Sequence, residues 1–176
     1  PIEQEGTYSL PEAQLDRFLM HVNVDYPDAS TERDILRLVR SQALDPGGQA
    51  DARPAHVLSQ AAVFEARREI LAMHMAPVVE EYIVQLTMAT RNPALYGEDV
   101  AAWCEYGASP RGTLALDVCA RANAFLLGKD FVSPDDVLAV VHDVLRHRLI
   151  LSFEAEAAGV TTDDVIDALV QRVAAA

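Results

Sequence analysis

The sequence predicts a mainly α fold, in which a helical bundle is preceded by a short α/β piece. Of the 176 residues, 51% are apolar, which is enough for a core, and only 8 are Gly. Ala, Leu and Val dominate, and long stretches carry no Pro; both features favour helix over strand. Only one short segment, near the N-terminus, alternates apolar and polar residues as a half-buried strand does.

Residues 1 to about 26 are expected to hold a short helix and a short strand. Pro11 and Glu12 suit a helix start, because the missing N–H of proline costs nothing there and an acid complements the helix dipole. Met20, Val22 and Val24 then alternate with polar residues, which predicts a strand. One strand leaves its backbone groups without partners. The strand must therefore belong to a sheet that this chain does not otherwise supply.

From about residue 28 onward the pattern is helical. Apolar residues recur at the three- and four-residue spacing of amphipathic helices. Polar, Gly-rich and Pro-rich stretches separate these helices. The expected segments are a helix capped by Ser30 or Thr31, a polar loop over about 41–54, and helices over about 57–75 and 78–90, separated near Pro77.

The second half of the chain contains clear helix starts. Residues 92–106 are expected to be irregular. Ser109 is a good N-cap, Pro110 fits the first helical position and Gly128 supplies the stop. Two further helices are expected, one starting at Ser133-Pro134 with Asp136 completing the cap, the other starting at Thr161 or Thr162. The chain thus divides into residues 1–27 and a bundle of about five or six helices over 28–176.

The net charge of −13 argues against two classes of partner. Phosphate backbones and anionic lipids would both be repelled, so we expect neither nucleic-acid nor membrane binding. The sequence has no apolar stretch long enough to span a bilayer and no secretory signal, which predicts a cytoplasmic location. Cys104 and Cys119 are expected to be reduced, mostly buried thiols. A start at Pro1 instead of Met suggests a fragment or a processed product.

The sequence lacks the common catalytic motifs. Lys129, the single lysine, follows Gly128, but no second glycine stands where a G-x-x-x-x-G-K-[ST] phosphate-binding loop needs it. Neither G-x-S-x-G nor H-E-x-x-H occurs. His142 and His147 do not share a helix face, so we interpret them as surface or helix-end side chains. No metal site is expected.

Two arginines stand out by their context. Arg17 lies between a predicted helix and a predicted strand. Arg111 lies in the first turn of the helix that begins at Ser109-Pro110, where free N–H groups already attract anions. A guanidinium at that place would strengthen phosphate binding. The spacing alone also allows a simpler interpretation, in which both arginines are structural ion-pair partners.

Two long runs resemble MoxR-type AAA+ ATPases. Residues 1–8 (PIEQEGTY) and 10–20 (LPEAQLDRFLM) resemble the segment that follows the sensor 1 asparagine of that family. Residues 107–112 (GASPRG) resemble its sensor 2 motif, and residues 82–84, 89–91 and 145–149 (LRHRL) resemble its lid. Gly112 stands where a residue such as alanine is common. The resemblance covers nearly the whole chain and identifies it as the C-terminal portion of such a protein.

The resemblance implies roles for individual residues. Arg17 matches the arginine finger, which reaches the γ-phosphate held by a neighbouring subunit. Arg111 matches the sensor 2 arginine, and Ser109 stands with it at the nucleotide. Tyr26 and Pro27 would lie at the hinge between core and lid, near the adenine pocket. Residues 1–27 would then be the end of the ATPase core, and residues 28–176 the helical AAA+ lid domain.

The resemblance also implies an activity for the parent protein. That protein would bind ATP and Mg²⁺, form an oligomeric ring, expected to be a hexamer, and couple hydrolysis to chaperone-like remodelling or maturation of an unknown client. The chain by itself lacks the phosphate-binding loop, the magnesium-binding acids and the sensor 1 asparagine. We therefore expect it neither to hydrolyse ATP nor to bind it tightly. The alternative is a stand-alone acidic helical domain that docks partner proteins without nucleotide chemistry.

Overall fold

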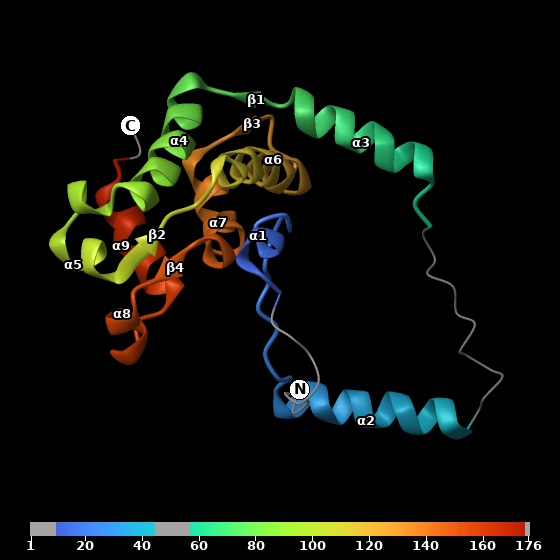
Figure 1. The fold of residues 1–176 in the computed structure, drawn as a ribbon. Coiled ribbons are helices and arrows are strands. Elements are labelled where there is room, and N and C mark those ends of the chain that lie inside the picture. The colour runs from blue at the N-terminus through green and yellow to red at the C-terminus, as the bar shows by residue number, and fades with distance from the viewer. Residues whose placement is uncertain (1–9, 45–56, 175–176) are drawn as a thin grey trace. The chain divides into compact units, whose positions relative to one another are not determined.

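The computed structural model describes residues 10–44 and 57–174. Helices dominate these residues, and the strands among them are only two or three residues long (Figure 1). By their contacts the described residues divide into two compact units. One unit holds the residues up to Val22 and from Arg68 onward, and the other is Asn23–Arg67. The domain boundary predicted at residue 27 remains a prediction.

The Asn23–Arg67 unit contains α2 (Ala29–Leu44) and most of α3 (Gln60–Ala72). The side chain that caps α2 is Asp28, not Ser30 or Thr31. Its Oδ1 accepts the N–H of Thr31 and the hydroxyl of Ser30, both at 2.8 Å. The hydrogen bond from the Thr31 backbone is the main reason that the pKa of Asp28 falls to about 2. The helix continues through Leu44, and the rest of the predicted loop, residues 45–54, lies outside the described residues.

The other unit is a helical bundle. The helices of the bundle and its N-terminal segment are α1 (Glu12–Leu15), α4 (Pro77–Arg91), η1 (Pro93–Leu95), α5 (Glu98–Trp103), α6 (Pro110–Leu126), α7 (Pro134–Leu145), η2 (Arg146–Arg148), α8 (Phe153–Ala157) and α9 (Thr162–Arg172). The most extensive packing is between α6 and α7. Fully buried apolar side chains from α4, α6, α7 and α9 meet in one core, among them Leu86, Leu116, Val141 and Ile166.

Two very small sheets join distant parts of the bundle. β1 (His74–Met75) pairs in parallel with β3 (Phe131–Val132), so that the chain before α4 lies beside the chain before α7. β2 (Cys104–Tyr106) pairs antiparallel with β4 (Ile150–Leu151). Cys104 and Cys119 are both free and buried, as expected.

The helix starts expected in the second half of the chain are confirmed. Ser109, Ser133 and Thr161 are the N-caps of α6, α7 and α9, and the latter two form capping boxes with Asp136 and Asp164. Such caps are reliable because they satisfy backbone N–H groups that the helix itself leaves free. Gly128, after α6, has a φ of +67°, a conformation that favours glycine.

Two expectations about local structure are wrong. No strand forms over residues 20–24. Within the described chain, that segment has no sheet to join, and the His21 N–H donates instead to the Asp143 carbonyl at 2.7 Å. Residues 92–106 are not irregular, since they contain η1, α5 and β2. The short helix α8 was not expected either. The predicted fold class, a mainly α bundle, is confirmed.

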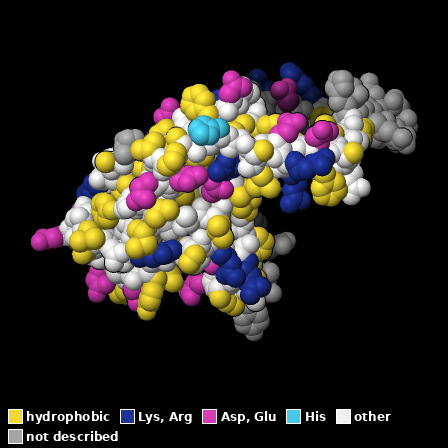
Figure 2. All heavy atoms as spheres, turned by 90° about the horizontal axis from the view of Figure 1, so that it is seen from above, with side chains coloured by type: hydrophobic (Ala, Val, Ile, Leu, Met, Phe, Trp, Pro, Cys, Tyr) yellow, Lys and Arg dark blue, Asp and Glu magenta, His cyan; other side chains and the backbone are white. Residues whose placement is uncertain are grey.

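Figure 2 shows how charged side chains are distributed on one face of the chain. On the face shown in Figure 2, acidic and basic side chains are interspersed with apolar ones. The net charge of −13 is therefore not gathered into one acidic patch on that face.

Candidate functional site

The candidate site lies at the N-terminus of α6. Ser109 has extended dihedral angles (φ −69°, ψ 171°), and its Oγ accepts the N–H of Arg111 at 3.2 Å. Pro110 occupies the first helical position, where no N–H is needed. Arg111 thus lies in the first turn of a long helix, and its side chain is 54% exposed.

The turn before α6 is held against the end of α4. The Ala108 N–H donates to Thr90 Oγ1 at 3.0 Å, and Arg91 Nε donates to the Ala108 carbonyl at 2.7 Å. Gly107 lies so close to the Thr90 carbonyl that a Cβ atom would have no room there. Gly112 is also tightly surrounded, since an added Cβ would lie 3.1 Å from Ala108 Cβ. The glycines of this segment allow close approach of α6 to its neighbours.

Asp16 connects the N-terminal segment to this helix start. The hydroxyl of Ser109 donates to both carboxylate oxygens, at 3.0 and 2.8 Å. Arg111 Nη1 donates to Oδ2 at 3.0 Å, and Arg148 Nε forms an ion pair with Oδ1 at 3.2 Å. Burial alone would raise the pKa of Asp16, but the hydrogen bonds from Ser109 and Arg111 and the charge of Arg148 hold it below its ordinary value. Asp16 is therefore a carboxylate at neutral pH.

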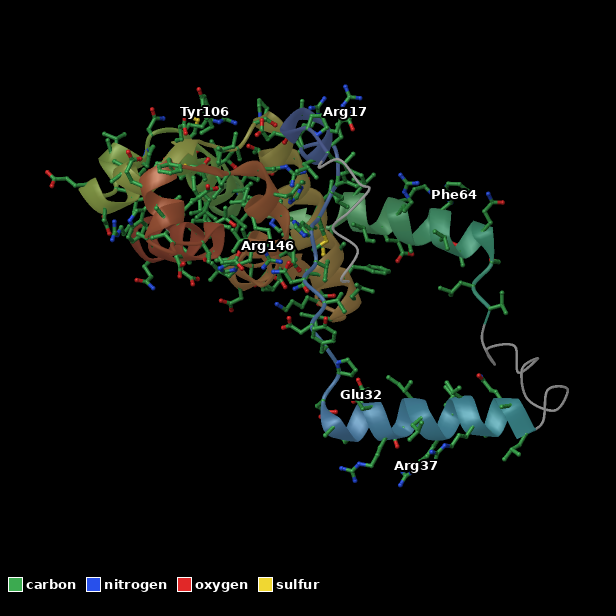
Figure 3. The ribbon with its side chains drawn as sticks, turned by 60° about the horizontal axis from the view of Figure 1, so that its bottom comes forward. Arg17, Glu32, Arg37, Phe64, Tyr106 and Arg146 are labelled. Atoms are coloured by element: carbon green, nitrogen blue, oxygen red, sulfur yellow. The ribbon has the colours of Figure 1, made fainter. Side chains whose placement is uncertain are left out.

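Arg17 follows Asp16 and is exposed. Figure 3 shows its side chain extending outward from the turn that follows α1. It forms no ion pair with any described residue. Its guanidinium is therefore available to an anion that approaches from outside the described chain.

Three arginines border one surface hollow. It has a volume of about 260 Å³ and is lined by Asp16, Arg17, Phe18, Leu19, Arg111, Leu114, Ala115, Val118 and Arg148. The charged residues of the lining are three arginines and one carboxylate, and the other five are apolar. The Arg148 side chain is almost fully buried, so Arg17 and Arg111 are the cations that a ligand could reach. Guanidinium groups donate paired hydrogen bonds to phosphate or carboxylate oxygens. The arrangement suits an anionic group presented by another molecule or by another part of the protein.

The structure brings together some of the predicted site residues. Ser109 and Arg111 share Asp16, and Arg17 lines the same hollow as Arg111. Tyr26 and Pro27 lie in the Asn23–Arg67 unit, where both are exposed, and their predicted role at a hinge remains a prediction.

Two important residues, Asp16 and Arg148, were not among the site residues predicted from the sequence. Asp16 stands inside the run over residues 10–20 (LPEAQLDRFLM) and Arg148 inside the run over residues 145–149 (LRHRL), and both runs carry the family resemblance. The only signal available was membership of those runs, because the contacts between them join distant parts of the chain.

The described ranges contain neither a cluster suited to a metal ion nor a helix suited to a membrane. Residues 10–44 and 57–174 hold no group of three or more His, Cys, Asp or Glu side chains placed to bind a metal ion. Over the same ranges, the structure has no helix whose length and hydrophobicity would let it span a bilayer.

Comparison with known proteins gives consistent matches. The AAA lid domain family matches residues 98–169. Chaperone MoxR1 of Mycobacterium tuberculosis is 38% identical over 175 residues, which cover 99% of this chain and 44% of that protein. Protein MoxR of Paracoccus denitrificans is 36% identical over 162 residues, covering 86% of this chain and 46% of the relative.

A solved structure matches as well. It is a crystal structure from Cytophaga hutchinsonii, of a protein provisionally described as an ATPase, with 39% identity and a TM-score of 0.87. The match covers 99% of this chain and 51% of that one. The chain thus spans about half the length of the relatives it matches. Together, these matches confirm the resemblance on which the sequence analysis relied.

Proposed function

We propose that this chain, a C-terminal portion of the MoxR type of AAA+ proteins, supplies the lid and the arginine finger of a ring-forming ATPase. In this proposal the ring is a cytoplasmic hexamer, and hydrolysis of ATP drives chaperone-like remodelling or maturation of partner proteins. The matched relatives named MoxR and the AAA lid domain support the class of protein. The arrangement of Arg17 and Arg111 supports the roles of individual residues.

The observation that carries the proposal is the hollow shared by Arg17 and Arg111. Both arginines line it, and Arg17 is exposed and makes no ion pair with the described residues. Two cations at one surface fit the terminal phosphates of a nucleotide that approaches from outside. We therefore propose that both arginines meet the terminal phosphates of a nucleotide that other parts of the assembled protein hold, with Arg17 reaching it from a neighbouring copy.

The chemistry required of these residues is electrostatic. In phosphoryl transfer, negative charge spreads over the oxygens of the transferred group, and a placed cation lowers the energy of that state. Arg17, with its free tip, would supply this cation as the finger. Arg111 would exchange Asp16 for phosphate and so connect the position of α6 to the state of the nucleotide. Tyr26 and Pro27 are proposed to lie near the adenine.

The remaining parts of the nucleotide site are proposed to lie elsewhere in the protein. The 176 residues contain no phosphate-binding loop, and the described residues offer no cluster of acids for Mg²⁺. Arg17 and Arg111 fit the anionic end of ATP, and the fold places no other described cation beside them except Arg148. The chain would therefore complete an ATP site instead of forming one.

Turnover by the full-length protein tests this proposal. Arg17→Ala is expected to lower kcat for ATP hydrolysis by about a thousandfold, because a finger acts mainly in the transition state, while ATP binding stays largely intact. Arg111→Ala is expected to weaken nucleotide binding or to uncouple it from hydrolysis. Arg40→Ala, at an exposed arginine of α2, is the control and should keep normal turnover. Normal hydrolysis by Arg17→Ala would contradict the finger assignment. A full-length protein without any nucleotide site would favour the acidic interaction domain.

A further inference from the structure

Three consecutive residues of the bundle hold the main chain around Arg17. Arg146 Nη1 donates to the His21 carbonyl at 2.8 Å, and His147 Nε2 lies 3.1 Å from the Phe18 carbonyl. Arg148 Nη2 donates to the same Phe18 carbonyl at 2.6 Å. Arg148 also reaches the carbonyls on both sides, those of Asp16 at 3.3 Å and Leu19 at 3.4 Å. Donors from residues 146–148 thus meet four main-chain carbonyls between residues 16 and 21, those of Asp16, Phe18, Leu19 and His21.

These donors are themselves fixed to the bundle. The three residues form η2, directly after α7, whose apolar side chains are buried in the core. Arg146 is paired with Asp143 at 2.6 Å and with Asp163, at the start of α9, at 3.0 Å. Figure 3 shows Arg146 among the side chains of the bundle, next to the N-terminal segment. The Arg148 side chain is 2% exposed and also donates to the Val144 carbonyl.

The main chain on either side of Arg17 is held by hydrogen bonds, whereas the Arg17 side chain is exposed. The carbonyls of Asp16 and Phe18, immediately before and after it, are both held by Arg148. Its guanidinium is exposed and forms no ion pair within the described part of the chain. A side chain that must meet a reacting phosphate needs a main chain that is held in place and a functional group that is not already paired. Small displacements of a catalytic group are costly.

We propose that Arg146, His147 and Arg148 are positioning residues that fix the main chain on both sides of Arg17 to the helical bundle and so set the reach of that arginine. We call these three residues the clasp. This inference rests on the proposed function, because it takes Arg17 to be the finger. It adds that the finger and the bundle move as one body, joined by side-chain to main-chain hydrogen bonds.

Substitutions in the clasp can separate positioning from folding. Arg148→Lys keeps the charge and the aliphatic part of the side chain. It removes the planar guanidinium that donates to the carbonyls of residues 16, 18 and 19. His147→Leu fills the space without a donor, and His147→Gln restores an N–H at about the place of Nε2. The control is Arg172→Lys. Arg172 also combines a carboxylate, that of Asp99 at 2.6 Å, with a carbonyl, that of Tyr96 at 3.0 Å, but it lies outside the clasp.

The experiment measures the steady-state kinetics of the full-length protein together with amide hydrogen exchange over residues 15–21. Arg148→Lys and His147→Leu are expected to lower kcat by at least about tenfold, with KM for ATP nearly unchanged. The same variants are expected to exchange faster in this segment, including at the His21 amide that donates to Asp143. His147→Gln should recover most of kcat, and Arg172→Lys should leave kcat and the segment unchanged.

The outcomes distinguish this inference from the proposed function. Faster exchange over 15–21 with normal kcat in both Arg148→Lys and His147→Leu would overturn the positioning role while leaving the finger in place, provided that Arg17→Ala is inactive. An equal loss of kcat in Arg172→Lys, or no recovery in His147→Gln, would overturn it in favour of general destabilisation. Normal turnover by Arg17→Ala would remove the finger itself, and the clasp would then be structural only.

Discussion

Arg111 Nη1 lies 3.0 Å from Oδ2 of Asp16, so the start of α6 is tied to the residue that precedes Arg17 in the chain. The same carboxylate lies 3.2 Å from the Arg148 guanidinium, which is almost fully buried. Asp16 therefore balances one exposed and one buried cation.

Replacing Asp16 tests the importance of this balance. Asp16→Asn keeps an acceptor for Ser109 but leaves the buried Arg148 without a negative partner. We expect a loss of about 3 kcal/mol in the free energy of unfolding, because removing one partner of a buried ion pair strands the other charge. Urea denaturation followed by circular dichroism measures it. The control is Asp167→Asn, whose exposed pair with His142 should be worth less than about 1 kcal/mol. Equal losses in the two variants would contradict this explanation.

Asp136 gives a second test, at the cap of α7. Its side chain is completely buried and accepts hydrogen bonds from Lys129 at 2.7 Å, from Asn123 at 2.9 Å and from the N–H and hydroxyl of Ser133. Burial alone would raise the pKa of Asp136, but these donors, Lys129 first, lower it to about 2. We expect Asp136→Asn to lower the free energy of unfolding by about 3 kcal/mol, since its amide must face donors and Lys129 loses its partner.

The matched control for Asp136 is Asp164. It stands at the same position of the capping box of α9 but is exposed. Asp164→Asn should therefore cost only about 1 kcal/mol, the usual contribution of a cap. The measurement is again the denaturation midpoint at constant slope. A loss in Asp164→Asn as large as that in Asp136→Asn would show that capping, and not the buried charge, sets the cost.

The lowered pKa of His147 predicts how the stability of the fold depends on pH. Burial lowers its pKa below the ordinary 6.5, and the charges of Arg148 and His21 act in the same direction, against the Phe18 carbonyl and Asp16. The folded protein therefore binds this proton less readily than the unfolded chain. His147 therefore has no effect on the free energy of unfolding above about pH 6.5. Below that pH it lowers this free energy, because the unfolded state then binds more protons than the folded one.

The experiment compares unfolding free energies at pH 7.5 and pH 5 for the wild type and His147→Gln. The wild type should lose more stability than the variant on acidification. The difference between them isolates His147 from the other titrating groups. An identical loss in the two proteins would show that His147 does not titrate differently on folding.

The helix starts could be predicted because their signals are local. Ser109-Pro110, Ser133-Pro134 and Thr161 each satisfy backbone groups within three residues of themselves. The short helix α5 carries no comparable signal. It has six residues and follows Gly97, and contacts from far along the chain support it, including the Arg172 guanidinium on the Asp99 carboxylate. Sequence pattern cannot show such support.

The predicted strand failed for a related reason. Alternation of Met20, Val22 and Val24 indicates only that one face could be buried. In the structure Val22 is 59% and Val24 is 89% exposed, and the nearby backbone bonds to Asp143 and Arg146 instead of a neighbouring strand. Hydrophobic alternation needs a partner strand to become a sheet.

The candidate site was predictable in part. Arg111 and Ser109 were identified by their position at a helix start and by resemblance, and the structure joins them through Asp16. The contact between Arg148 and the Asp16 carbonyl spans 132 positions of the chain. A contact between such distant residues produces no recognisable pattern in a single sequence, so the clasp could be identified only from the fold.

The pairing of Lys129 with Asp136 has a practical consequence. Lys129 is the single lysine of the sequence, and its ammonium group lies 2.7 Å from a carboxylate that is completely buried. Among the side chains of these 176 residues, acetylation or lysine-directed crosslinking would have only this amine to attack, and neutralising it would leave the carboxylate without its cation. Fluorophores and surface tethers for this chain are therefore better attached through an introduced cysteine on an exposed helix face than through its native amine.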